Sequence, residues 1–178
     1  MRKRDKIKKP QRPVVAYEIL PPREKDGTLN SYAETISSLL SQTHIDAINI
    51  PEVHDEIGRG ERPVSNQDRG EPRKFGMLLQ DIVGIEAIVN RVVVHMPLKE
   101  QMKWIEETYS KYEIDNLIIV GGESSKQEYP GPTVNQSLKE ISNITIGDGK
   151  NIFCGGICIP SRKKESKNLI KKSESGAE

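Results

Sequence analysis

Runs of apolar, mostly β-branched residues alternate along this chain with segments in which apolar residues recur at helical spacing. The apolar runs predict five strands, at residues 13–20, 45–50, 91–96, 116–120 and 151–159. The helical spacing predicts helices over 29–42, 75–89, 98–112 and 133–142, with Asn30 or Ser31 as the N-cap of the first, and a basic helix that ends near Glu174. Strands and helices that alternate in this way are typical of βαβ units with a parallel sheet.

The number of βα units leaves two architectures open. Five units suit an open doubly wound sheet, whereas a (β/α)8 barrel has eight units and about 250 residues. Ser175, Gly176 and Ala177 follow the last helix as a helix stop that leads into another strand. We therefore expect the chain to end where a sixth strand begins. The long polar loop at 52–73 is expected to be a lid over the site.

Charge is distributed unevenly over the 178 residues, although the formal net charge is only +1. Residues 1–12 hold seven Lys and Arg against Asp5, which leaves residues 13–178 with 20 basic and 25 acidic residues. We interpret 1–12 as a basic, flexible leader and 13–178 as the folded part. The near balance of charges argues against a chain built as a whole to bind nucleic acid.

The composition also indicates the cellular compartment in which we expect the protein. Hydrophobic residues make up 34% of the chain, and no apolar run approaches the roughly 18 residues that a membrane span needs. The basic leader has no apolar segment behind it, so it is not expected to be a secretory signal. Cys154 and Cys158 do not make a disulfide framework and are interpreted as buried, inert thiols. These features predict a cytoplasmic protein without membrane contact.

Parallel-sheet enzymes place their chemistry at the carboxyl ends of the strands, and Glu18 is the most informative residue there. A carboxylate inside an apolar strand is costly to bury in its charged form. Desolvation favours the protonated form, which suits a general acid near neutral pH. The alternative is that Glu18 points to solvent or pairs with Arg23.

Other strand ends offer weaker candidates. His95 follows three valines, and a hydrogen-bonded strand-end histidine is its plainest interpretation. Gly121, Gly122 and Glu123 follow the fourth strand, where glycines let the backbone approach a cofactor, although no nucleotide-binding fingerprint is present. His54 lies among acidic residues, which we interpret as a solvated loop rather than a metal site.

The segment VAYEILPPR, at Val15–Arg23, resembles the first strand of the methylenetetrahydrofolate reductase family, where an aromatic-Glu-apolar-apolar-Pro-Pro pattern opens a (β/α)8 barrel. Later segments resemble that family in the same order: VVVHM, NLIIVGGE with its Pro-Gly-Pro loop, GGICIPSR and KKSESGAE. The resemblance covers nearly all of 13–178 but only about five of eight barrel units. It implies an α/β chain that forms the N-terminal part of a (β/α)8 TIM barrel.

The resemblance also implies an activity and a set of site residues. The family reduces 5,10-methylenetetrahydrofolate to 5-methyltetrahydrofolate with NAD(P)H, usually through FAD. Glu18 would be the general acid that protonates N10 of the folate and opens its five-membered ring. The remaining assignments are cofactor contacts at His95, Gly121, Gly122, Glu123 and Lys172, and substrate contacts at Asn49 and Glu123.

Two segments depart from the family pattern. Gly121-Gly122-Glu123 stands where the family has Arg-Gly-Asp, so the arginine that would meet the flavin phosphates is missing. Ile159-Pro160-Ser161-Arg162 stands where the family has Tyr-Pro-Glu-x-His. Both forms look more like divergent reductases that take hydride directly from NAD(P)H, so the need for FAD is open.

Three classes of function follow from these observations. The first is a folate-dependent oxidoreductase of one-carbon and methionine metabolism. The second is a catalytically silent module that binds folate or a partner, because an open barrel leaves strand edges that invite pairing. The third is another barrel enzyme that uses Glu18 on a different substrate. We expect a small-molecule substrate, no bound metal and no specific nucleic acid, and leave a homo-oligomer open.

Overall fold

The computed structural model describes residues 12–54, 68–122, 127–146 and 149–178. The chain forms two compact units, Met1–Val89 and Asn90–Glu178. The main strands are β1 (Ala16–Glu18), β2 (Ala47–Pro51), β3 (Ala87–Val92), β4 (Asn116–Val120) and β7 (Phe153–Gly156). They form one sheet in the order β1-β2-β3-β4-β7. The predicted α/β class with a five-stranded parallel sheet is confirmed, and the sheet is open over the described residues, so no closed barrel is seen.

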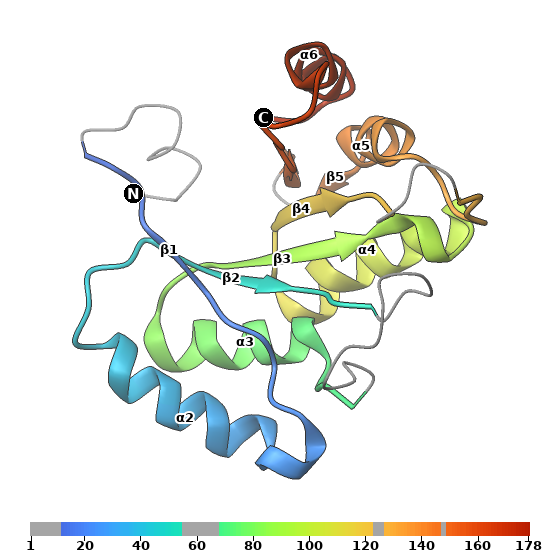
Figure 1. Ribbon diagram of the computed structural model, residues 1–178. Helices are drawn as coiled ribbons and strands as arrows, with labels where there is room; N and C mark the ends of the chain where they lie inside the picture. The colour runs from blue at the N-terminus through green and yellow to red at the C-terminus, as the bar shows by residue number, and fades with distance from the viewer. Residues whose placement is uncertain (1–11, 55–67, 123–126, 147–148) are drawn as a thin grey trace. The chain divides into compact units, whose positions relative to one another are not determined.

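The first unit pairs its strands in parallel and carries two helices. Glu18 of β1 lies opposite Asn49 of β2 in the register. The helices α2 (Leu29–Leu40) and α3 (Pro72–Val83) lie side by side, and the short 3-10 helix η1 (Glu24–Asp26) precedes them (Figure 1). Tyr32 of α2 meets the fully buried Phe75 of α3 with 5.8 Å between ring centroids. This contact anchors α2 on α3.

Side-chain caps determine where both helices begin. Thr28, rather than the predicted Asn30 or Ser31, is the N-cap of α2, and its side chain accepts a hydrogen bond from the Ser31 N–H. Glu71 caps α3 in the same way, and Pro72 occupies its first position. No helix in the described ranges is long and apolar enough to cross a membrane.

A buried acid ties Arg12 to the first unit. The Arg12 guanidinium donates to both carboxylate oxygens of Asp46, at 2.8 and 3.0 Å, and the Val15 N–H donates to the same carboxylate. The Asp46 side chain is only 2% exposed. Arg12 therefore belongs to the folded part rather than to the leader, and the rest of the predicted leader, 1–11, lies outside the described residues.

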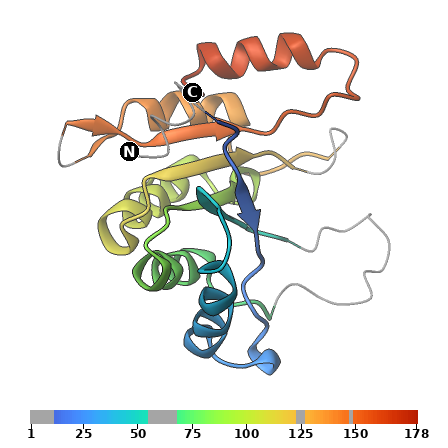
Figure 2. The same cartoon turned by 90° about the vertical axis from the view of Figure 1, so that its left-hand side faces the viewer.

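The second unit contains the end of β3, both remaining sheet strands and three helices. Its other elements are the 3-10 helix η2 (Val93–His95), α4 (Leu98–Tyr112), α5 (Val134–Ser142), the hairpin strands β5 (Thr145–Ile146) and β6 (Lys150–Asn151), and α6 (Glu165–Glu174). Leu117 of β4 lies opposite Cys154 of β7 in a parallel pair. Figure 2 shows α5 and α6 lying side by side. A capping box of Thr133 and Gln136 begins α5.

The boundary between α3 and β3 differs from the prediction. The helix predicted over 75–89 ends at Val83, because Gly84 adopts a left-handed conformation and its N–H caps the Gln80 carbonyl. The strand predicted at 91–96 lies at Ala87–Val92 instead, and His95 falls in η2. All six residues of β3 are buried. A short apolar run of this kind fits a helix or a strand equally well by periodicity.

The outer strands are shorter than predicted. The strand expected at 13–20 forms ladder pairs only over Ala16–Glu18. The strand expected at 151–159 divides between β6 and β7, because a hairpin that turns at Gly149 takes up Asn151. Cys158 consequently lies outside the strand.

Candidate functional site

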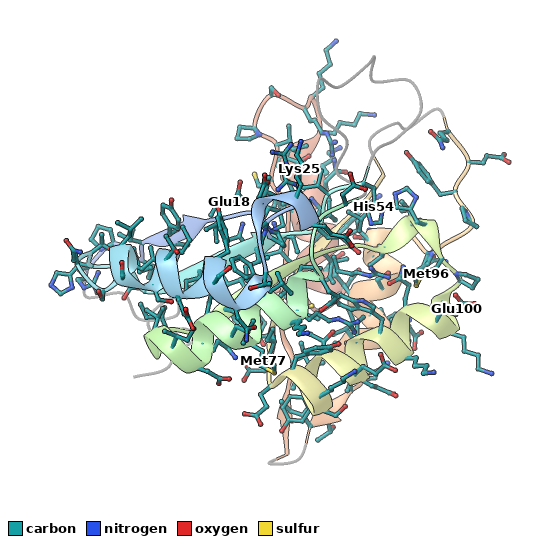
Figure 3. The ribbon with its side chains drawn as sticks, turned by 90° about the horizontal axis from the view of Figure 1, so that it is seen from below. Glu18, Lys25, His54, Met77, Met96 and Glu100 are labelled. Carbon is teal, nitrogen blue, oxygen red and sulfur yellow. The ribbon has the colours of Figure 1, made fainter. Side chains whose placement is uncertain are left out.

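The first unit brings two predicted site residues together. The Asn49 side-chain amide donates to the Glu18 carboxylate at 2.8 Å, a contact that follows from their opposite positions in the β1-β2 ladder. The side-chain carbonyl oxygen of Asn49 is buried and has no hydrogen-bond partner among the described residues. Figure 3 labels Glu18, which stands on β1. The pair places an exposed carboxylate beside a buried amide oxygen near the carboxyl ends of two adjacent strands.

The expected burial of Glu18 is wrong. All three residues of β1 are exposed, and Tyr17 is 45% exposed. Arg23 does not pair with Glu18 either, because its guanidinium donates to Asp26 at 2.8 Å. The solvent-facing alternative therefore describes Glu18 in this structure. The reason is positional: β1 is an end strand, and a sequence pattern does not show whether a further element covers it.

The Pro21-Pro22 segment that follows β1 is fixed by residues far along the chain. Both prolines are buried. Arg69 donates to the Pro21 carbonyl at 2.8 Å, and the Gly70 N–H donates to the Pro22 carbonyl at 2.9 Å. A Cβ at Gly70 would lie 2.5 Å from a methyl carbon of Leu29, so the Leu29 side chain would have to shift to admit one. The exit of β1 is held in one place as a result.

The acidic segment after β2 contains a close contact between a histidine and a glutamate. His54 Nε2 lies 3.3 Å from a Glu52 oxygen. Most of the expected lid at 52–73 lies outside the described residues, together with Asp55 and Glu56. Within the ranges that the structure describes, no three His, Cys, Asp or Glu side chains are placed to hold a metal ion.

In the second unit, a buried cation fixes the turn that carries His95. Arg91 is 4% exposed, and its guanidinium lies 4.3 Å from the centroid of the Trp104 ring. It donates to the Gln101 side chain at 2.9 Å, and the Gln101 amide donates to the Val93 carbonyl at 2.8 Å. This chain of contacts connects α4 to η2 and sets the position of His95.

His95 lies beside an aromatic residue that sequence analysis did not single out. The rings of His95 and Tyr129 meet edge to face, with 5.6 Å between centroids. The hydroxyl end of the Tyr129 ring covers Gly122 so closely that a side chain at this glycine would overlap it. Gly121 faces Val134 instead. Gly122 thus makes room for Tyr129, and Glu123 lies outside the described residues.

Lys172 has partners within its own unit. Its ammonium group donates to the Ile157 carbonyl and lies 3.3 Å from a carboxylate oxygen of Glu165, which is buried. The stem of Lys172 passes close over Gly156 of β7. Lys172 therefore ties the segment after β7 to α6.

The Glu165 contacts predict a pH dependence of stability. Hydrogen bonds from Asn168 and from the Ile159 N–H, together with Lys172, hold the pKa of Glu165 below its ordinary value of 4.5. Because the folded state depresses this pKa, the stabilisation is complete above pH 4.5 and is lost as pH falls through the folded value. The stability difference between the wild type and Glu165→Gln is expected to shrink between pH 7 and pH 3 in urea unfolding. Glu174→Gln, an exposed change on the same helix, is the control. A constant difference over this range would contradict the assignment.

The two cysteines differ from each other. Burial raises the pKa of Cys154 to about 12, which agrees with the predicted inert thiol. Cys158 is exposed, so the expectation that it is buried is wrong.

Asn90 is a further polar residue that sequence analysis missed. It is 7% exposed on β3, and its side-chain carbonyl oxygen has no partner among the described residues. It interrupts the apolar segment AIVNRV much as Glu18 interrupts its own strand. Sequence analysis missed Asn90 because the predicted strand began only at Arg91, so Asn90 was not seen as a polar residue inside an apolar strand.

A similarity to known proteins is found in structure rather than in sequence. No family model and no curated protein matches the chain. A solved structure, described as an uncharacterized protein from Clostridium thermocellum that binds two copies of 5-methyl-5,6,7,8-tetrahydrofolic acid, is similar with a TM-score of 0.70 and 16% identity. The match covers 98% of this chain and 55% of that one, so this chain spans about half the length of its neighbour. At this identity the likeness shows the fold.

Proposed function

We propose that this chain binds a reduced folate at the carboxyl ends of β1 and β2. The observation that carries the proposal is the Glu18–Asn49 pair, which lies in a fold similar to that of a protein described as binding 5-methyltetrahydrofolate. One Glu18 oxygen is held by Asn49, and the exposed carboxylate leaves the other accessible. Strand ends are where parallel-sheet proteins hold their ligands.

The chemistry of the pair suits the pterin ring. The aminopyrimidine part of a reduced folate carries N–H donors along one edge, and both Glu18 and the Asn49 carbonyl oxygen are acceptors. A buried amide oxygen without a partner costs about 1–3 kcal/mol. An N–H donor of the ligand would recover this free energy at Asn49 when a side-chain rotation on binding brings the buried oxygen to the ligand.

A second candidate is reduction of 5,10-methylenetetrahydrofolate, which the Glu18 carboxyl group favours. In this candidate the folate is bound with N10, rather than the aminopyrimidine edge, against Glu18. Glu18 would give its proton to N10 as the bond between N10 and the methylene carbon breaks, which leaves an iminium carbon on N5. A hydride from NAD(P)H then reduces that carbon to the methyl group, and NAD(P)⁺ is released. A folate that covers the exposed Glu18 would supply the desolvation that the free protein lacks.

The proposal extends to the complete fold and to the family. We infer that the five strands are the first βα units of a (β/α)8 barrel of the methylenetetrahydrofolate reductase type. The strand order β1-β2-β3-β4-β7 supports the barrel part of this inference, because successive main strands along the chain are neighbours in the sheet, as in a barrel of this type.

Two contacts among the described residues count against FAD at the site that the family resemblance implies. Tyr129 occupies the space beside Gly122, and the Lys172 ammonium group is engaged by Glu165 and the Ile157 carbonyl. We therefore propose NAD(P)H as the direct hydride donor of the second candidate.

A calorimetric titration with 5-methyltetrahydrofolate tests the binding proposal. The wild type is expected to give a saturable isotherm. Asn49→Leu, which keeps the size but removes the amide, is expected to weaken binding about tenfold, because one hydrogen bond is worth about 1 kcal/mol or slightly more. Asn30→Leu, on the exposed surface of α2, is the matched control and should leave the affinity unchanged. A wild type that shows no binding at millimolar ligand would contradict the proposal.

A further inference from the structure

Contacts with two segments of the second unit, η2 and the residues that follow β4, hold Tyr129 in place. Its ring meets His95 edge to face and covers Gly122. Two residues further on, the Gly131 N–H donates to the Val94 carbonyl at 2.8 Å. The loop is thus attached to η2 on one side and continues into the capping box of α5 on the other.

Two glycines are needed to seat this ring. A side chain at Gly122 would overlap the ring itself. At Gly131, a Cβ would lie 2.5–2.7 Å from backbone atoms of Val93, Val94 and Met96. The loop can therefore approach η2 this closely only with glycine at position 131. The local sequence therefore builds a specific position for Tyr129 at the carboxyl end of β4.

Tyr129 is nevertheless only half-buried, so the residue is partly accessible to solvent. An aromatic ring that is fixed by its neighbours before a ligand arrives loses little conformational entropy on binding. Rings of this kind bind other planar rings by stacking or edge-to-face contact, and aromatic pairs of this type contribute measurably beyond the area that they bury.

The geometry points to Tyr129 as a ligand-contacting residue whose ring forms a fixed platform for a planar, conjugated ring. The nicotinamide of NAD(P)H is one source of such a ring and follows from the proposed function on which this inference rests. The pterin or aminobenzoyl ring of a folate bound by the second unit itself is the other source. The shared chemistry is the planar conjugated ring, and His95 contributes by holding the platform rather than by reacting.

The test measures affinity with matched tyrosine variants. Tyr129→Leu is expected to weaken binding of 5-methyltetrahydrofolate or NADH about five- to tenfold, whereas Tyr129→Phe keeps it within twofold. Gly122→Ala is expected to weaken binding like Tyr129→Leu, since the added methyl group displaces the ring. Tyr109→Leu, at a half-buried tyrosine on α4, is the control and should change nothing. A Tyr129→Leu variant with wild-type affinity for both ligands would overturn the inference.

A second measurement separates this inference from the folate proposal. Protein labelled with ¹³C-tyrosine is titrated with 5-methyltetrahydrofolate, 6-methyltetrahydropterin, p-aminobenzoylglutamate, NADH and riboflavin, and the Tyr129 resonance is assigned with Tyr129→Phe. A shift with the pterin, the aminobenzoate or NADH identifies the source of the ring. A Tyr129 resonance that moves with riboflavin or NADH but not with any folate compound supports the platform and assigns it a ring other than that of a folate. Folate binding at Glu18 and Asn49 is then tested separately by the calorimetric titration of the wild type and Asn49→Leu. A resonance that none of the five probes moves overturns the platform, whatever binds elsewhere.

Discussion

Glu18→Gln is expected to slow the reduction of 5,10-methylenetetrahydrofolate by NAD(P)H about 10²–10⁴-fold, the usual contribution of a general acid. Glutamine keeps the side-chain length and can still contact Asn49, but it has no carboxyl proton to give to N10. The affinity for 5-methyltetrahydrofolate should change far less, because this product has no bond at N10 to break. NADH oxidation and calorimetric affinity, measured on the same preparations, separate the two effects.

The matched control is Glu24→Gln, an exposed glutamate in η1 outside the ladder of β1 and β2. It should leave both quantities unchanged. Wild-type turnover in Glu18→Gln would remove Glu18 from the acid role. A wild type that binds folate without oxidising NADH would reject the reductase and leave the binding module.

Gly131→Ala is expected to lower the free energy of unfolding by about 3 kcal/mol, at the upper end of overpacking effects. The added Cβ would lie 2.5–2.7 Å from three backbone atoms of η2 and the residue that follows it, and backbone cannot move aside as a flexible side chain can. The hydrogen bond from the Gly131 N–H to the Val94 carbonyl would lengthen or break. Urea unfolding followed by circular dichroism measures the change.

Gly155→Ala is the control for this substitution. Its Cβ would lie 3.9 Å or more from its neighbours, an ordinary van der Waals contact, so the stability should change by less than about 1 kcal/mol. Equal effects of the two alanines would show that the close approach at Gly131 does not restrain the loop. A destabilised Gly131→Ala should also weaken the Tyr129 contact, since the loop places that ring.

The sequence predicted the order and the class of the elements, because alternating apolar runs and helical periods reflect local chemistry. It failed where a boundary depends on backbone conformation. Nothing in the apolar pattern of 75–89 shows that Gly84 turns left-handed and that a strand begins at Ala87. The prediction that Glu18 is buried was wrong for another reason. The exposure of a residue on an end strand depends on which other elements cover the sheet, and this is a property of the tertiary structure.

The candidate site was predictable where the chemistry lies on a strand and missed where it depends on a loop. Glu18 and Asn49 were both expected at strand ends, and the parallel register brings them into contact. Tyr129 lies in a loop without periodicity, and only the folded backbone shows that it covers Gly122. We expected Gly122 to leave space for a cofactor, but the Tyr129 ring of the protein itself fills that space. A pair of glycines in a sequence does not show which group lies against them.

The location of a bound folate tests the central claim most directly, and a crystal structure of the full chain with 5-methyltetrahydrofolate would provide it. We predict density for the pterin ring within hydrogen-bond distance of the Glu18 carboxylate and the Asn49 side-chain carbonyl oxygen, at the carboxyl ends of β1 and β2. Crystals grown at saturating ligand in which Glu18 and Asn49 contact no folate would contradict the account.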